Sequence, residues 1–160
     1  MKHITHMALT VSLAAHMNIV IAHPDAALKT ASEQAQAQAI VHVLKKQFDQ
    51  PQSPLTVTPV AVEEDWAVAG WSQDVRGGRA LLNKRHGQWV IVVCGGDGLR
   101  QASTLAQTGM KAAEARALAM KLQAAESRLP AETLRKFASF EGMLRMDGSA
   151  HGTHAAHPKR

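Results

Sequence analysis

The sequence predicts an α+β fold: an N-terminal helix, a four-stranded antiparallel meander, C-terminal helices and a disordered His-containing tail. Three observations support this prediction. Apolar residues recur at helical spacing near both ends of the chain, whereas its middle alternates with period two. Short turn-forming segments separate the alternating runs, and no helical pattern lies between them, which is typical of antiparallel neighbours. The chain has 160 residues, which is the size of one domain.

The first 22 residues have the pattern of an export signal. An apolar run over 7–15 follows a positively charged start, and Val20 and Ala22 suit the small-residue rule for cleavage before His23. An earlier cut within 12–14 and an uncleaved amphipathic anchor are the alternatives. Export predicts a periplasmic protein. Because no apolar run reaches 18 residues, no membrane span is expected to be retained.

Helical spacing predicts the first helix over 26–48. Leu44 and Phe48 belong to its apolar stripe, and His42 is expected on the opposite, exposed side. Two prolines within 49–54 then end the helix.

Four strands are expected to follow. Pro59 restricts the first strand to a sheet edge or a bulge, and His86 with Gly87 is typical of a tight hairpin turn. The segment 74–79 is expected to be a loop. The last strand is almost entirely apolar, which favours an interior position in the sheet. The four predicted strands cover 55–62, 66–72, 80–85 and 89–94.

The remaining pattern is helical. A short helix over 99–108 is expected to end at Gly109, and an Ala-rich helix over 112–129 follows. Pro130 begins a last short helix, with Leu134 and Phe137 facing inward. Met110 and Met120 are expected to fill gaps in a core with few aromatic residues. The predicted domain thus covers 23–146, and 147–160 forms the tail.

Composition and motifs argue against several functions. The net charge of +5 comes from scattered basic residues without interleaved aromatic residues, so nucleic-acid binding is not expected. The motif CGGDG at 94–98 matches neither the dinucleotide fingerprint nor the phosphate loop. Cys94 is the only cysteine, and His86 is too distant along the strand to activate it. We therefore expect no catalytic residues and no enzymatic activity.

A metal site is the one chemistry that the sequence indicates. His151, His154 and His157 recur at every third position of the tail, and Met143 and Met146 precede them. Imidazole and thioether together suit copper, as Cu(II) or Cu(I), although zinc or nickel are possible. Flexible spacing of this kind permits binding but does not enforce a closed tetrahedral zinc geometry.

Two further residues are possible metal ligands. Cys94 is interpreted first as a buried structural thiol and second as a soft Cu(I) ligand. His23 would become a chelating N-terminus if cleavage occurs directly before it. The simpler interpretation of His23 is a cleavage-site flank.

Several motifs resemble the copper uptake system-associated proteins. They are EDWAVAGW at 64–71, GRALL at 78–82, HGQW at 86–89, CGGDG at 94–98 and FASFEG at 137–142, followed by a histidine-containing tail. The resemblance covers roughly 28–157. It implies an exported protein encoded with bacterial copper-handling genes and implies no established catalytic residues.

The sequence thus predicts an exported copper-binding accessory protein that captures or hands over copper through its C-terminal segment. Its expected partners are the copper ion and a membrane copper transporter or another periplasmic copper protein. The alternative is a periplasmic protein–protein interaction module with no metal role.

Overall fold

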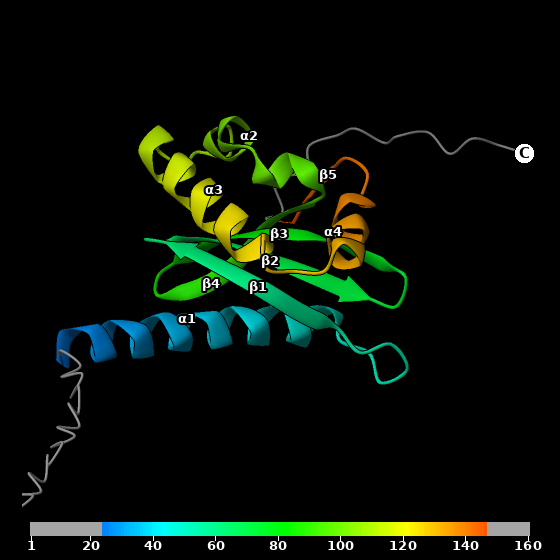
Figure 1. Ribbon diagram of the computed structural model, residues 1–160, viewed down its shortest axis with the longest axis horizontal. Helices are drawn as coiled ribbons and strands as arrows, with labels where there is room; N and C mark the ends of the chain where they lie inside the picture. Colours follow the sequence, from blue (N-terminus) through cyan, green and yellow to red (C-terminus); the bar gives the residue numbers. More distant parts are fainter. Residues whose placement is uncertain (1–23, 147–160) are drawn as a thin grey trace, which may run out of the picture.

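A computed structural model describes residues 24–146, which form an α+β fold with one five-stranded antiparallel sheet. The strand order is β1-β2-β3-β4-β5. Helix α1 covers one face of the sheet, and α2, α3 and α4 lie on the other (Figure 1). The elements are α1 (Pro24–Phe48), β1 (Thr56–Glu63), β2 (Trp66–Gln73), β3 (Arg76–Arg85), β4 (Gln88–Gly95), the 3-10 helix η1 (Asp97–Arg100), α2 (Ala102–Ala106), α3 (Ala112–Glu126), α4 (Ala131–Ala138) and β5 (Met143–Arg145).

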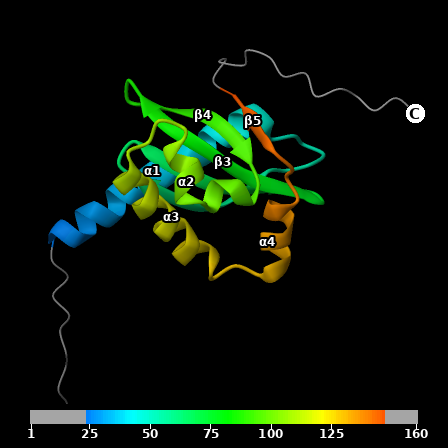
Figure 2. The same ribbon diagram turned by 90° about the horizontal axis from the view of Figure 1, so that it is seen from above.

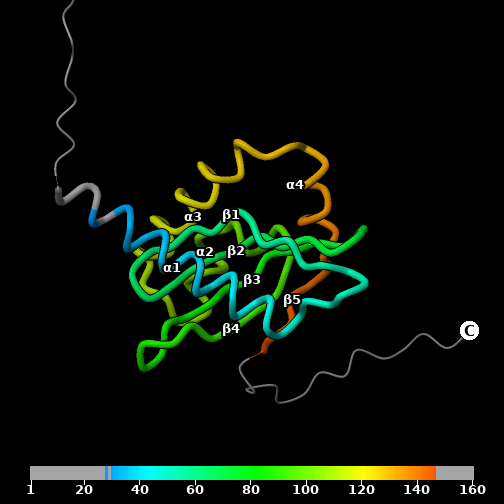
Figure 3. The backbone as a smooth tube through the Cα atoms, turned by 90° about the horizontal axis from the view of Figure 1, so that it is seen from below, coloured from blue at the N-terminus to red at the C-terminus, as the bar shows by residue number. Residues whose placement is uncertain are grey.

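Helix α1 runs across one face of the sheet, as the view of that face in Figure 3 shows. Ile40 and Leu44 are fully buried against the sheet, whereas His42 is exposed on the other side of the helix, as the periodicity predicts. The helix ends at Phe48. The carboxylate of Asp49 then accepts a hydrogen bond of 2.6 Å from the backbone N–H of Leu55, which closes the loop that leads into β1.

The first four strands form the expected meander, joined by three two-residue turns. His86 and Gly87 both have positive φ, in agreement with the predicted hairpin. β1 is the edge strand of the sheet, and its register shifts between Val57 and Val60, on either side of Pro59. Both features of the first strand are therefore confirmed.

The expected loop over 74–79 is wrong, because β3 already begins at Arg76. Gly77 and Gly78 lie within the strand and are buried. A Cβ atom at Gly77 would meet the backbone of Lys136 at 2.9 Å, and one at Gly78 would meet the Trp71 ring at 2.8 Å. The two glycines therefore serve close packing on both faces of the strand and not a flexible loop.

The sheet has five strands where the sequence predicted four. β5 pairs with β4 through Val93, Cys94 and Gly95. The physical reason is that β4 is buried along nearly its whole length, so a sheet that ended there would expose an apolar edge. β5 covers part of that edge, which gives β4 the interior position expected from its composition.

The helices on the second face differ in detail from the prediction. The single helix expected over 99–108 is divided into η1 and α2, which are separated at Gln101, a residue with extended backbone angles. α3 ends at Glu126, three residues before the predicted end. Met110 is buried as expected. The prediction that Met120 is a core residue is wrong, because this residue is 65% exposed. Among the described residues, no helix has both the length and the apolar character needed to cross a membrane.

A buried ion network ties the sheet to these helices. Arg79, fully buried on β3, donates two hydrogen bonds to the carboxylate of Glu126, at 2.6 and 3.1 Å. It donates a third to Asp97 of η1 at 3.0 Å, and its guanidinium lies 5.3 Å from the centre of the Phe137 ring. Arg100 adds a second ion pair to Glu126. Seen from above, α3 and α4 follow one another along this side of the molecule and are joined by a short connection (Figure 2).

Candidate metal centre

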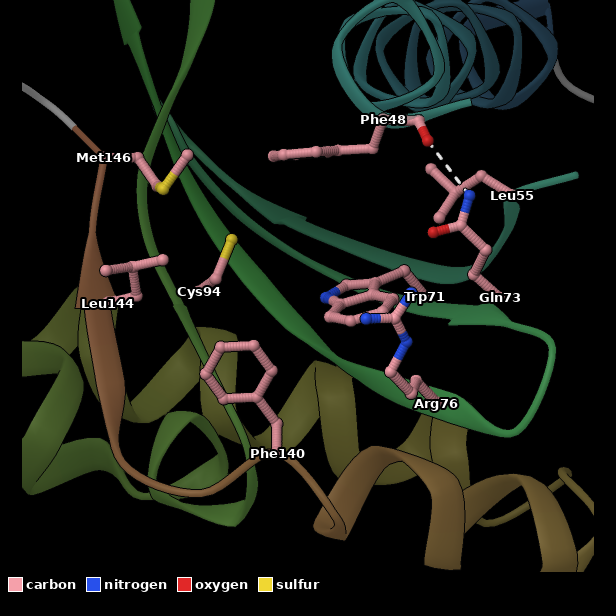
Figure 4. A pocket seen from close by; sticks show the side chains of 9 residues that line it. All are labelled: Phe48, Leu55, Trp71, Gln73, Arg76, Cys94, Phe140, Leu144 and Met146. Atoms are coloured by element: carbon pink, nitrogen blue, oxygen red, sulfur yellow. Dashed lines mark hydrogen bonds between the residues drawn. The ribbon is translucent and has the colours of Figure 1, made fainter. Parts of the chain in front are cut away.

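An apolar pocket of about 170 Å³ opens on the α1 face of the sheet, beyond the C-terminal end of that helix. Figure 4 shows its side chains, which come from α1, from strands β2, β3, β4 and β5 and from segments that connect or follow these elements. The pocket exists because α1 ends at Phe48 before it covers the last part of this sheet face. Its lining residues are Phe48, Leu55, Trp71, Gln73, Arg76, Cys94, Phe140, Leu144 and Met146.

Two of the sequence-predicted ligands, Cys94 and Met146, line this pocket together. Cys94 lies on β4, opposite Ala80 on one side and Leu144 on the other. The backbone N–H of Met146 donates a hydrogen bond of 2.8 Å to the carbonyl of Val92, which holds the chain beside β4 just past β5. Because side chains alternate along an extended chain, Leu144 and Met146 point to the same side. Figure 4 shows the sulfur atoms of Cys94 and Met146 on the side of the sheet where the pocket lies.

Cys94 is a protonated, protected thiol. Cys94 is only 6% exposed and forms no disulfide. Burial raises the pKa of its thiol to about 11. The first interpretation from the sequence, a buried thiol, is therefore confirmed. A thiol with this pKa is a poor nucleophile near pH 7, because the reactive form is the thiolate.

Aromatic rings and two polar side chains complete the pocket. The rings of Trp71 and Phe140 meet edge to face, with centroids 6.0 Å apart. The side-chain nitrogen of Gln73 already donates hydrogen bonds to the carbonyl oxygens of Phe48 and Ser53. Arg76 is an exposed residue of the pocket wall. Neither a carboxylate nor an imidazole is among the described residues that line the pocket.

Met143 does not join this group. It lies three positions before Met146, so alternation places its side chain on the opposite face of β5. There it approaches Gly95 and Gly98, and the residue is 52% exposed. The two methionines, which the sequence pattern treats as a pair, therefore face different sides of the sheet.

The histidines of the prediction cannot be placed in the fold. His151, His154, His157 and His23 lie outside the described residues. Within 24–146, His42 on α1 and His86 in the β3–β4 turn are both exposed. Across that same described part of the chain, no three His, Cys, Asp or Glu side chains are grouped so that they could hold a metal ion.

Sequence reasoning missed the aromatic wall of the pocket. Trp71 and Phe140 are far apart in the chain, and no local pattern brings them together. One signal was present: after Gly142, a residue type typical of turns, Leu144, Arg145 and Met146 alternate apolar, polar and apolar. That alternation predicts a short strand, and a short strand beside β4 brings Met146 to Cys94.

Comparison of this chain with family models, with curated proteins and with solved structures finds no match.

Proposed function

We propose that this protein is an exported, non-enzymatic copper-binding accessory protein, which captures or hands over copper through its C-terminal segment. His151, His154 and His157 are the proposed Cu(II) ligands. In this proposal residues 1–22 direct the chain to the periplasm and are then removed.

The observation that supports the proposal is the position of Met146. This residue lines the pocket with Cys94 and is held there by its hydrogen bond to Val92, and the segment 147–160 continues directly from it. His151 is five residues further along, so its Cα lies within about 17 Å of that of Met146, the reach of five extended residues. The segment that carries the proposed imidazole ligands thus follows directly on a residue that lines the pocket.

This arrangement suits transfer of an ion. Imidazoles on a linear segment can bind or release a metal one at a time, whereas a closed site holds its ion until the whole shell opens.

The proposal is tested by titrating Cu(II) into the chain 23–160 by calorimetry at neutral pH. Replacing His151, His154 and His157 by Ala should remove most of the Cu(II) uptake. His23 is kept in every protein compared, so that any chelation by the N-terminus is common to all of them. The matched control is the double variant His42→Ala and His86→Ala, which removes two exposed imidazoles from the fold and should leave uptake unchanged.

Uptake by the unaltered protein should also fall as the pH drops below about 6, because protonated imidazole does not bind metal. If the triple variant takes up as much Cu(II) as the unaltered protein, the tail is not the copper site.

A second candidate, a protein–protein interaction module, is supported by the surface of β5. Met143 and Leu144 are 52% and 55% exposed on the open edge of the sheet. Under this alternative, substitution of Leu144 by Lys would weaken a complex with a periplasmic partner, and the triple His variant would behave like the unaltered protein.

A further inference from the structure

The pocket beside β5 brings together two soft donors from distant parts of the chain. Cys94 provides a thiol and Met146 a thioether, and the other lining side chains contribute hydrocarbon, aromatic surface, one amide and one guanidinium. Thiolate and thioether sulfur select Cu(I) over harder cations.

Charge also decides which ion fits. With no carboxylate in the wall, the thiolate of Cys94 would be the one anionic ligand among the lining residues. A monovalent ion bound to one thiolate is neutral overall, whereas a divalent ion would leave an uncompensated positive charge in an apolar pocket. Burying such a charge is costly, so the pocket disfavours Cu(II) and Zn(II).

We propose that Cys94 and Met146 form a Cu(I) site on the folded domain, separate from the histidines of the tail. This inference deepens the proposed function, since it assigns Cu(I) to the pocket and leaves Cu(II) to the tail. Trp71 and Phe140 contribute aromatic surface to the wall of the site, and Met143 takes no part because it faces the other side of β5.

The binding step needs no oxidant or reductant. Cu(I) arrives as Cu(I), the S–H bond of Cys94 breaks, a Cu–S bond forms and the proton leaves to solvent. The thioether of Met146 donates a lone pair and loses nothing. The oxidation state of copper and of both sulfurs is unchanged throughout.

The test uses the chain 23–160 with His151, His154 and His157 replaced by Ala, so that tail imidazoles cannot contribute. Cu(I) is supplied as its bicinchoninate complex under argon, and transfer to the protein is followed by the loss of that complex's colour. We expect this variant to take up one equivalent of Cu(I).

Adding Met146→Leu should weaken Cu(I) binding at least about tenfold, because even the mutation of a residue that only supports a metal ligand lowers metal affinity by that factor. Adding Met143→Leu, the same substitution on the opposite face, should leave binding unchanged. Adding Cys94→Ala should abolish it. Because Cys94 is buried, its replacement could disturb the fold, and urea unfolding of each variant shows whether it does. If Cys94→Ala is misfolded, the comparison of Met146→Leu with Met143→Leu still decides the test.

X-ray absorption at the copper edge supplies a second measurement, which should report sulfur and no nitrogen around the ion. The inference is overturned if the triple His variant takes up no Cu(I), or if Met146→Leu and Met143→Leu bind equally well. The two proposals fail separately, because the pocket is tested with Cu(I) in the absence of the histidines and the tail with Cu(II).

Discussion

Gly96 lies where the chain leaving α4 passes over the end of β4. A Cβ atom built at this position would overlap the carbonyl oxygen of Phe140. At Gly98, two residues later, the nearest atom is the sulfur of Met143 at 4.0 Å. The glycines of the CGGDG motif are therefore not equivalent, and close packing of backbone on backbone explains Gly96 without a phosphate ligand.

We expect Gly96→Ala to lower the free energy of unfolding by about 1–3 kcal/mol, the usual cost of forcing an atom into a packed site. Gly98→Ala should change it by less than about 0.5 kcal/mol, because the added methyl group meets open space. Urea unfolding of both variants measures the difference. Equal effects would show that the loss of glycine itself matters, and not the contact with Phe140.

At the scale of elements, the pair between Arg79 and Glu126 joins β3 to the end of α3. Both side chains are 1% exposed, and each of their charged groups is fully hydrogen-bonded, so the burial cost is offset by geometry. Glu126 is the last residue of α3, and its ion pair keeps the end of this helix packed against the sheet. A sequence pattern assigns a glutamate at a helix end to solvent, because the pattern contains no information about an opposing arginine.

Replacing Glu126 by Gln should destabilise the fold by about 3–5 kcal/mol, because Arg79 would keep its charge in a buried site with a weakened partner. The matched control is Glu132→Gln. Glu132 pairs with Lys136 on the surface of α4 at 3.6 Å, and its side chain is 70% exposed. That change should be worth less than about 1 kcal/mol. If the two variants unfold at the same urea concentration, the buried network does not hold β3 to α3.

Over the whole molecule, the sheet separates two apolar cores. Ile40, Leu44 and Trp89 belong to the core beneath α1, whereas Val68, Leu81 and Leu118 belong to the core beneath α2 and α3. The same strands supply both cores, so loss of packing on one face should weaken the other. Under two-state unfolding the two cores are lost in one transition.

We therefore expect Leu44→Ala to cost about 2–5 kcal/mol, as a fully buried leucine normally does. Leu28→Ala, on the same helix but 70% exposed, should cost less than about 0.5 kcal/mol. Unfolding is followed by far-ultraviolet circular dichroism and by tryptophan fluorescence. If Leu44→Ala separates the two signals into different transitions, α1 is not part of the same cooperative unit.

Local patterns were sufficient for most of the elements. The alternation of Trp66 and Val68 against Ala67 and Ala69 predicts correctly that the two sets face opposite sides of the sheet. The His86-Gly87 turn, the Pro59 bulge and the inward Phe137 were equally readable, since each depends on neighbours within a few residues. The predicted strand pairing therefore agrees with the structure over β1 to β4.

Errors occurred where a residue's role depends on a distant segment. Gly77 and Gly78 resemble a loop until α4 and Trp71 are packed against them. The sequence prediction assigned residues 143–145 to the domain but to no strand, because their pairing depends on the edge of β4. Met120 follows the apolar composition of α3, but only the direction of the helix against the sheet decides that its side chain points outward.

The sequence by itself determined the α+β class, the strand boundaries at the 64–65 and 86–87 turns and the set of sulfur and nitrogen donors, because these follow from periodicity, backbone preferences and residue chemistry. The tertiary structure alone decided which donors meet. Cys94 and Met146 are 52 residues apart and come together because β5 pairs with β4, whereas Met143 is turned away by the alternation of a single strand. Proximity of this kind is created by the pairing of strands and is not encoded in the spacing of the residues along the chain.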